Sequence, residues 1–188
     1  MQAQRQEFQT RMANVDAHDL VFVDESGANT AMTRTCGRAP RGERVMAAAP
    51  GAWDNVTLIS GMRLSGVVAP FALAGAVDGT VFQTYVEQAL VPQLVPGDIV
   101  VWDNLRVHHN PAVRAAVEAA GARLEPLPVW SPDLTPIEEM YAKTKDYLRA
   151  VGARSTDAVI NAMGEALDRV TQSDIRGWFH DRCAYAML

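Results

Sequence analysis

Apolar and polar residues recur along the chain in two periods, one typical of buried strands and one typical of amphipathic helices. Short apolar runs that end in turn residues predict strands over residues 19–27, 98–104 and 122–129. A β-branched stretch broken by glycines predicts one or two further strands between Val56 and Leu73. Another strand is predicted near Glu43–Ala49, after an arginine-rich loop or hairpin.

Helices are predicted where apolar residues return every three or four positions. After Asp78, the apolar residues at 82, 85, 86, 89 and 90 share one helical face. The segment "PAVRAAVEAAG" begins with proline and ends with glycine, as helices often do. Further helices are predicted over residues 135–151, 156–170 and 174–185, and residues 1–17 are predicted to be a helical lead-in.

The order of these elements predicts the fold class. Three early strands precede helix, strand, helix, strand and helix, which is an α/β arrangement with a mixed five-stranded sheet and helices on both faces. This order fits the ribonuclease H arrangement. A parallel dinucleotide-binding fold fits less well, because "DESGAN" follows the first strand in place of a glycine-rich turn. We expect residues 1–18 to be a lead-in or linker and residues 19–188 to be one domain.

Composition narrows the class of protein. The chain has 188 residues, of which 48% are hydrophobic, so one domain with a substantial core is expected. No apolar run reaches the length of about 18 residues that a membrane span needs, and no apolar signal core precedes the first strand. Two distant cysteines predict a reducing cytoplasm. The net charge of −5 argues against nucleic acid binding over the whole surface, but it allows a local basic patch.

Two aspartates follow buried strands of this predicted sheet. Asp24 comes after the apolar run of the first strand, and Asp103 comes after the run that ends at Trp102. Ligand sites in open α/β sheets lie at the carboxyl ends of strands, so the two carboxylates are expected to converge if these strands are neighbours. The structural alternative for each is a turn former or helix cap.

Glu138 is the third candidate carboxylate. The run Thr135-Pro136-Ile137-Glu138 also fits a capping box, which would explain the glutamate structurally. A helical wheel buries residues 137, 140, 141, 144, 148 and 151, puts Glu138 on the flank of that face and turns Glu139 towards solvent. Lys145 and Arg149 share the flank of Glu138, either as a solvated helix side or as a row of phosphate contacts.

Three converging carboxylates suit Mg²⁺ or Mn²⁺, which prefer oxygen ligands. Two such ions can activate an attacking water or hydroxyl and stabilise the leaving oxygen at a phosphodiester. His108 and His109 are adjacent, so they cannot both face one site from a regular element. We assign them a supporting role, a DNA contact or a plain loop position.

Several motifs resemble the catalytic domain of DDE transposases of the mariner superfamily, and most closely the bacterial insertion-sequence branch. The motifs are "VFVDESG", "VVWDN" followed by "HH", and "WSPDLTPIEEMYAKTKDYL". Residues 104–137, 34 in number, separate Asp103 from Glu138, which matches the D-34-E spacing of this superfamily and selects Glu138 over Glu139. The segment "TRTCGRAPRGER" also resembles the basic segment after the first strand in that branch.

The resemblance implies a ribonuclease H-like, retroviral integrase-type fold, with Asp24, Asp103 and Glu138 holding two Mg²⁺ or Mn²⁺ ions. It implies DNA strand cleavage at transposon ends, followed by strand transfer into target DNA at TA, by a homodimer in the bacterial cytoplasm at the nucleoid. With this family context, contacts to DNA are expected from a set of basic residues, namely Arg34, Arg38, Arg41, Arg44, His108, Lys145 and Arg149.

One departure from the family pattern leaves alternatives open. Residues 1–18 are too few for the N-terminal helix-turn-helix region of full-length relatives. The chain is therefore expected to be a frameshift product or to work with a separate helix-turn-helix polypeptide, to be an isolated catalytic domain, or to be a truncated remnant. The alternative function is an inactive transposon-derived domain that binds DNA or dimerises. A ribonuclease that cuts RNA–DNA hybrids shares the fold but not the "SPDLTPIEE" block.

Overall fold

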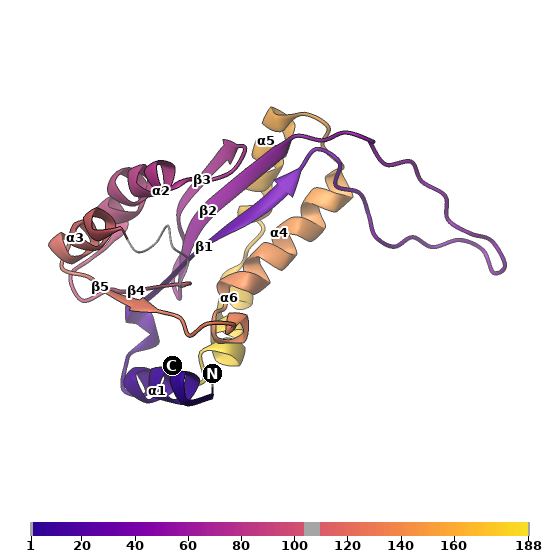
Figure 1. The fold of residues 1–188 in the computed structure, drawn as a ribbon. Helices are drawn as coiled ribbons and strands as arrows, with labels where there is room; N and C mark the ends of the chain where they lie inside the picture. The colour runs from indigo at the N-terminus through magenta and orange to yellow at the C-terminus, as the bar shows by residue number, and fades with distance from the viewer. Residues whose placement is uncertain (1, 104–109, 188) are drawn as a thin grey trace.

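A mixed five-stranded sheet lies at the centre of the protein, in a computed structural model that describes residues 2–103 and 110–187 (Figure 1). The strand order is β3-β2-β1-β4-β5, with β1 antiparallel to β2, β2 antiparallel to β3, and β1, β4 and β5 parallel. The predicted mixed five-stranded sheet is confirmed as a class. The strands are β1 (Leu20–Asn29), β2 (Asn55–Arg63), β3 (Gly66–Ala74), β4 (Ile99–Trp102) and β5 (Arg123–Pro126).

The two central parallel strands are buried on both faces. Val21 and Val23 of β1 enter one hydrophobic cluster, while Leu20 and Phe22 enter the other. All four residues of β4 are buried and alternate between the same clusters. Continuous apolar runs are typical of strands covered on both sides, which is why these two strands are recognisable from sequence.

Helices cover both faces of the sheet (Figure 1). On one face lie α2 (Gly79–Tyr85), a π-helical turn and a 3₁₀ turn that continue it to Gln93, and α3 (Pro111–Ala119). On the other lie α4 (Ile137–Val151), α5 (Thr156–Leu167) and α6 (Gln172–Arg182). No helix in the described part of the chain is long and apolar enough to cross a lipid bilayer.

The predicted lead-in is a helix, α1 (Gln2–Met12), that packs against the rest of the protein. Phe8 and Met12 are fully buried, and the ring of Phe8 meets that of Tyr185 edge-on, with the centroids 5.3 Å apart. Arg11 forms an ion pair with Glu125 of β5 at 2.6 Å. The helix therefore contributes side chains to the core, while the domain boundary at residue 18 stays a prediction.

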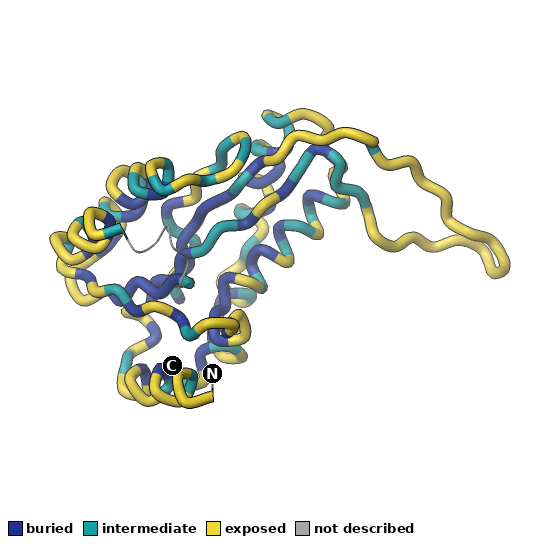
Figure 2. Tube along the Cα trace, viewed as in Figure 1, coloured by how far each residue is buried: buried dark blue, intermediate teal, exposed yellow. Residues whose placement is uncertain are grey.

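Residues 31–54, here called the arm, connect β1 to β2 and extend away from the body (Figure 1). Every residue from 34 to 49 is exposed, which Figure 2 shows as a continuous yellow loop. The predicted strand at Glu43–Ala49 is therefore wrong. Its apolar residues favour a strand locally, but no strand among residues 2–103 and 110–187 pairs with them. They are also not in the core, since Val45 is 47% and Met46 84% exposed.

The base of the arm is fixed by hydrogen bonds. The backbone N–H of Thr30 donates to the carbonyl of Asp54 at 3.1 Å, and the N–H of Asp54 donates to the Thr30 hydroxyl at 3.0 Å. Arg154, just beyond α4, donates to the carbonyls of Thr30 and Met32. These contacts set where the arm leaves the body and leave its far part without buried side chains.

Candidate active site

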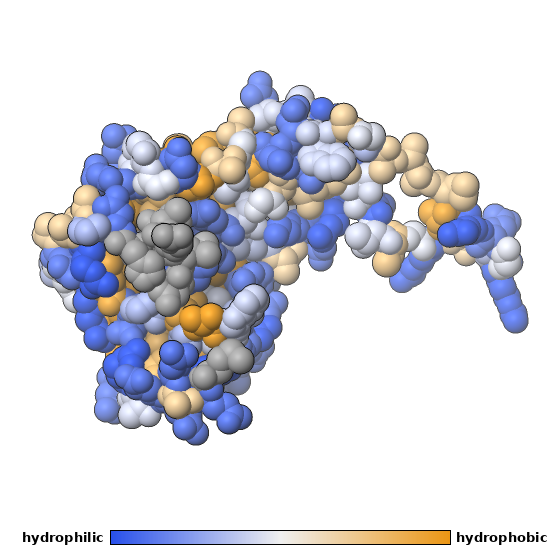
Figure 3. All heavy atoms as spheres, in the orientation of Figure 1, coloured by the Kyte–Doolittle hydropathy of each residue, from blue (hydrophilic) through white to orange (hydrophobic). Residues whose placement is uncertain are grey.

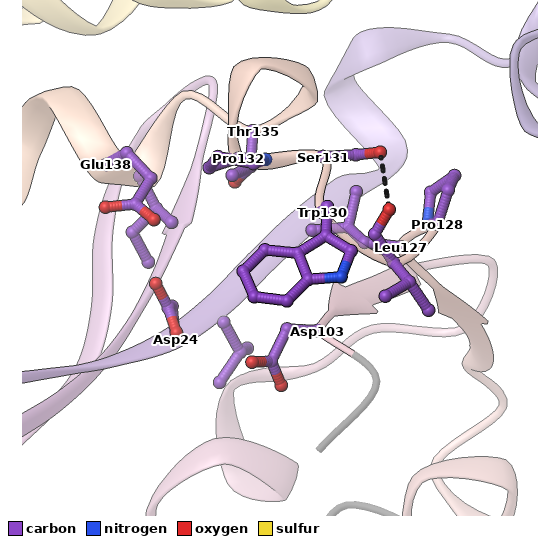
Figure 4. Close-up of a pocket in the computed structure, with 12 residues that line it drawn as sticks. Asp24, Asp103, Leu127, Pro128, Trp130, Ser131, Pro132, Thr135 and Glu138 are labelled. Atoms are coloured by element: carbon purple, nitrogen blue, oxygen red, sulfur yellow. Dashed lines mark hydrogen bonds between the residues drawn. The ribbon is translucent and has the colours of Figure 1, made fainter. Parts of the chain in front are cut away.

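A cleft of about 320 Å³ opens at the carboxyl end of β4 and beside the middle of β1 (Figure 4). Asp24 does not follow the first strand as predicted, because β1 continues past it to Asn29. Its lining includes the three predicted carboxylates, Asp24 from β1, Asp103 after β4 and Glu138 from α4. Figure 4 shows the carboxylates of Asp24 and Glu138 facing each other. The remaining lining is largely apolar and consists of Val23, Leu127, Pro128, Val129, Trp130, Ser131, Pro132, Thr135 and Ile137.

The strand register explains why the two aspartates meet. Phe22 of β1 pairs with Val101 of β4. Asp24 lies two residues after Phe22 within β1, and Asp103 lies two residues after Val101, directly past the end of β4. Residues two apart in a strand point to the same face. The side chains of both aspartates therefore point to the face of the sheet on which Phe22 and Val101 pack. This is the face that α4 covers.

Glu138 lies in the first turn of α4, and the structural alternative, a capping box with Thr135, is wrong. The helix begins at Ile137 with Pro136 at the N-cap, and no side chain caps it. Thr135 is buried and extended, because the preceding residues form a 3₁₀ turn that carries the chain into the helix. Glu138 is exposed on the cleft side, so its place is not explained by capping.

Glu139 does not line the cleft, as the helical wheel predicts. It is not simply solvated, however, because its carboxylate forms an ion pair with Arg182 of α6 and its side chain is only 32% exposed. The wheel also buries Val151, which is 47% exposed at the last turn of α4. A helical wheel shows only one helix, so it includes neither the contact of Glu139 with α6 nor the end of α4 at Val151, beyond which the core no longer covers the helix.

Tyr141 joins α4 to β1 directly behind the carboxylates. Its hydroxyl donates to the backbone carbonyl of Asp24 at 2.5 Å, and the Ser60 hydroxyl lies 3.0 Å away and donates to it in turn. Burial raises the pKa of Tyr141 well above its usual value, and the charge of Asp24 raises it further. The phenol therefore stays protonated and holds the two carboxylate-bearing elements together.

Asp133, the remaining acid of the "SPDL" turn, faces away from the cleft. Arg5 of α1 donates to both of its carboxylate oxygens, at 2.9 and 2.5 Å, and to the Ser131 hydroxyl at 2.9 Å. The hydrogen bonds from Arg5 lower the pKa of Asp133. This acid is a structural tie between α1 and the turn.

Trp130 is a cleft residue that the sequence does not single out. It is 83% exposed and has a φ of +59°, a left-handed conformation that costs a non-glycine residue about 1–3 kcal/mol. Hydropathy periodicity cannot find such a residue. The only sequence indication is a large aromatic residue in a proline-rich loop, where no core face is expected.

The predicted DNA contacts fall into three places. Lys145 and Arg149 share a shallow groove along α4 with Glu138, and Arg149 pairs with Asp146 at 2.7 Å. Four arginines lie on the arm outside the cleft, and all are exposed: Arg34, Arg38, Arg41 and Arg44. In the space-filling view the far end of the arm is mostly hydrophilic, with one apolar patch (Figure 3). His108 lies outside the described residues.

The donor set of the cleft fits a hard divalent cation, because three carboxylates offer oxygen ligands. Among residues 2–103 and 110–187, no three His, Cys, Asp or Glu side chains stand close enough to hold one ion together as they are placed. Shared coordination by Asp24, Asp103 and Glu138 therefore requires rotation of their side chains.

The fold is that of solved transposase structures. The chain resembles the "Mos1 mariner paired end complex with Mn" with a TM-score of 0.75 and 18% identity, covering 97% of this chain and 59% of that one. A pre-cleavage Mos1 transpososome gives 0.74 and 17%, covering 97% and 58%. The Mos1 catalytic domain with raltegravir and Mg gives 0.71 and 17%, covering 97% and 89%.

The chain thus spans somewhat under three fifths of the longer transposase chain in the pre-cleavage complex and most of the isolated catalytic domain. At these identities the likeness shows the fold, and the predicted ribonuclease H-like class is confirmed. A search of curated proteins found no match. Residues 19–160 match the family described as "DDE superfamily endonuclease", and the chain therefore belongs to that family.

Proposed function

We propose that this chain is the catalytic domain of an insertion-sequence transposase that cuts DNA strands and joins them to new sites. The observation that carries this proposal is the single cleft that Asp24 of β1, Asp103 just after β4 and Glu138 of α4 all line. Asp24, Asp103 and Glu138 are the proposed catalytic residues. The family match supports an endonuclease, and the fold of the solved transposases supports the transposase assignment.

We propose two Mg²⁺ or Mn²⁺ ions as the cofactor, held by the same three carboxylates. Crystal structures of the similar Mos1 protein contain Mg or Mn. When bound, such ions activate the attacking water or hydroxyl and stabilise the leaving oxygen. They also offset an electrostatic problem, because three carboxylates would otherwise repel the negatively charged phosphodiester.

The chain's own groups fix the positions of the acids. The N–H of Glu25 donates to the Asp24 carboxylate at 2.8 Å, while Tyr141 holds the Asp24 carbonyl. Glu138 approaches from the opposite side on the first turn of α4. Lys145 and Arg149 continue along the same flank of α4, where they are proposed to contact DNA phosphates.

The proposed substrate and partners follow the bacterial insertion-sequence branch of the mariner superfamily. We propose transposon-end DNA and a target at TA, a homodimer in the active complex, a separate helix-turn-helix polypeptide or frameshift partner, and a place at the bacterial nucleoid. The similar solved structures support the DNA substrate, because they are a transpososome, a strand transfer complex and a paired-end complex with the left transposon end.

Nicking of a supercoiled plasmid tests the enzyme assignment. The wild-type chain is expected to nick DNA only when Mg²⁺ or Mn²⁺ is present, and Asp103→Ala is expected to be inactive. Equal nicking by wild type and variant would contradict the proposal and leave a transposon-derived domain that binds DNA without cutting it. Faster cutting of RNA–DNA hybrids than of DNA would favour a ribonuclease instead.

A further inference from the structure

Trp130 is in a position that neither folding nor packing explains. Its side chain is 83% exposed, so it adds almost nothing to the core. Its φ of +59° is a backbone conformation that glycine adopts readily and a tryptophan does not. By contrast Trp102, at the end of β4, is 3% exposed and packs against Phe82 with the ring centroids 5.5 Å apart. An exposed ring at a strained position points to contact with something outside the fold.

The backbone that follows Trp130 is tied to α1. Ser131 is 3% exposed, and its hydroxyl accepts a hydrogen bond from Arg5 and lies 3.5 Å from the Val129 carbonyl (Figure 4). Arg5 also clamps Asp133 through both carboxylate oxygens. The turn that carries the ring is therefore tied to α1, and the ring is presented from a fixed support rather than from a loose loop.

The ring stands beside the candidate catalytic acids. Trp130 lines the same cleft as Asp24, Asp103 and Glu138, and Figure 4 shows the indole in the space between Asp103 and Thr135. Figure 4 shows Asp24 and Glu138 on one side of the cleft and Leu127 and Pro128 on the other, so one side is acidic and the other apolar. A ligand that fits this cleft has an anionic group, which bound cations would bridge to the carboxylates, and a flat apolar face that packs on the apolar side. A nucleotide has both.

We propose that Trp130 is a stacking surface for an unpaired nucleobase next to the phosphodiester bond that the three acids address. The inference rests on the proposed function for the role of those acids. Aromatic side chains stack on any base, because every base has a π-face. In a closed duplex those faces are covered by neighbouring base pairs, so Trp130 selects DNA that is single-stranded, frayed or opened by flipping a base.

Binding of fluorescent DNA tests this proposal without any requirement for cutting. All proteins carry Asp103→Ala, so that bound DNA stays intact. The probes are a short single-stranded oligonucleotide that contains 2-aminopurine and a duplex of the same sequence. Both ends of the duplex are closed by non-nucleotide linkers, so that it holds no unpaired base. Trp130→Ala, Trp130→Gly and Trp130→Phe are compared with unchanged Trp130. The glycine variant tolerates the positive φ and so guards against misfolding.

The expected result is selective. Trp130→Ala and Trp130→Gly bind the single strand about 5- to 150-fold more weakly and no longer quench 2-aminopurine. Trp130→Phe retains most of the affinity for the single strand and most of the 2-aminopurine quenching. Binding of the closed duplex changes little in any variant. Phe71→Ala is the matched control, because Phe71 is an exposed aromatic residue on β3 outside the cleft, 41% exposed, and its loss should leave both probes unaffected.

Two outcomes would overturn the proposal. Unchanged affinity of Trp130→Ala for the single strand would mean that the ring serves another ligand, such as a protein partner. Equal weakening for single strand and closed duplex would mean that it contacts the groove or backbone rather than a base. Failure of the proposed function is separate: if Asp103→Ala nicked plasmid as wild type does while the Trp130 effects persisted, the stacking surface would stand and the catalytic assignment would fall.

Discussion

The cleft and the arm carry opposite charges and are built in opposite ways. Around the cleft, the acids are supported by buried groups: Tyr141 holds Asp24, and Glu138 stands on a helix packed against the sheet. The arm presents its arginines from a segment in which every residue from 34 to 49 is exposed. Coordination of a metal ion needs donor atoms fixed to a fraction of an ångström. Attraction of cations to DNA phosphates acts over a longer range and tolerates looser geometry.

The largest expected effect is on the nicking rate, and it should differ between substitutions of two adjacent glutamates of α4. Glu138→Gln should reduce metal-dependent nicking by at least about 100-fold, since it removes a charged donor from the cleft. Glu139→Gln keeps a hydrogen-bonding partner for Arg182 and should have little effect. The test compares the nicking rates of the two purified variants with that of the wild-type chain at saturating Mn²⁺. Similar losses in both would mean that the helix face is misassigned.

A smaller effect is expected from the tie behind the acids. Tyr141→Phe removes the donor to the Asp24 carbonyl and strands the Ser60 hydroxyl, at a cost of about 1–3 kcal/mol in the free energy of unfolding. Because Asp24 is then held less well, the Mn²⁺ concentration for half-maximal nicking should rise. Denaturant unfolding and Mn²⁺ titration of activity measure the two consequences.

Tyr85 provides the matched control for that experiment. Its hydroxyl is also buried but has no hydrogen-bond partner among the residues that the structure describes. Tyr85→Phe should therefore leave stability equal or slightly improved and leave the Mn²⁺ requirement unchanged. If both tyrosine variants shifted the Mn²⁺ requirement alike, general loosening of the core would explain the effect and Tyr141 would have no special positioning role.

The smallest expected effect on cutting comes from the arm. Replacing Arg38 and Arg41 by alanine should weaken duplex binding and reduce the slope of log affinity against log salt by about 0.9 for each DNA phosphate that the arm no longer neutralises. Because the cleft is untouched, nicking at saturating DNA should change little. Affinities measured at several salt concentrations test this, and an identical slope for the variant would show that these arginines do not touch phosphate.

The parts of the fold that the sequence predicts correctly are those specified by local pattern. The buried runs before Asp24 and Asp103 identify β1 and β4, because a strand covered on both faces is apolar throughout. The same pattern misleads at Glu43–Ala49, where strand-forming residues pair with no strand in the described part of the chain. Whether an apolar run is paired depends on the rest of the chain, and hydropathy periods do not contain that information.

In the candidate site, too, the sequence predicts what depends on local pattern and misses what depends on distant parts of the chain. Two features of the sequence select Glu138. Its position on the helical wheel is a local pattern, and its spacing from Asp103 is counted directly along the chain. The supports of the site escape such reasoning, since Tyr141 reaches a carbonyl 117 positions away and Arg5 reaches an acid 128 positions away. Trp130 escapes it for another reason: its exposure and positive φ become visible only when the turn is folded.

We propose above that Asp24, Asp103 and Glu138 hold shared divalent ions. Anomalous diffraction from crystals grown with Mn²⁺ tests it most directly, because manganese can be located without reference to the protein atoms. We expect manganese in the cleft within bonding distance of carboxylate oxygens from all three residues. Manganese bound elsewhere, or in the cleft with Glu138 turned away, would contradict it.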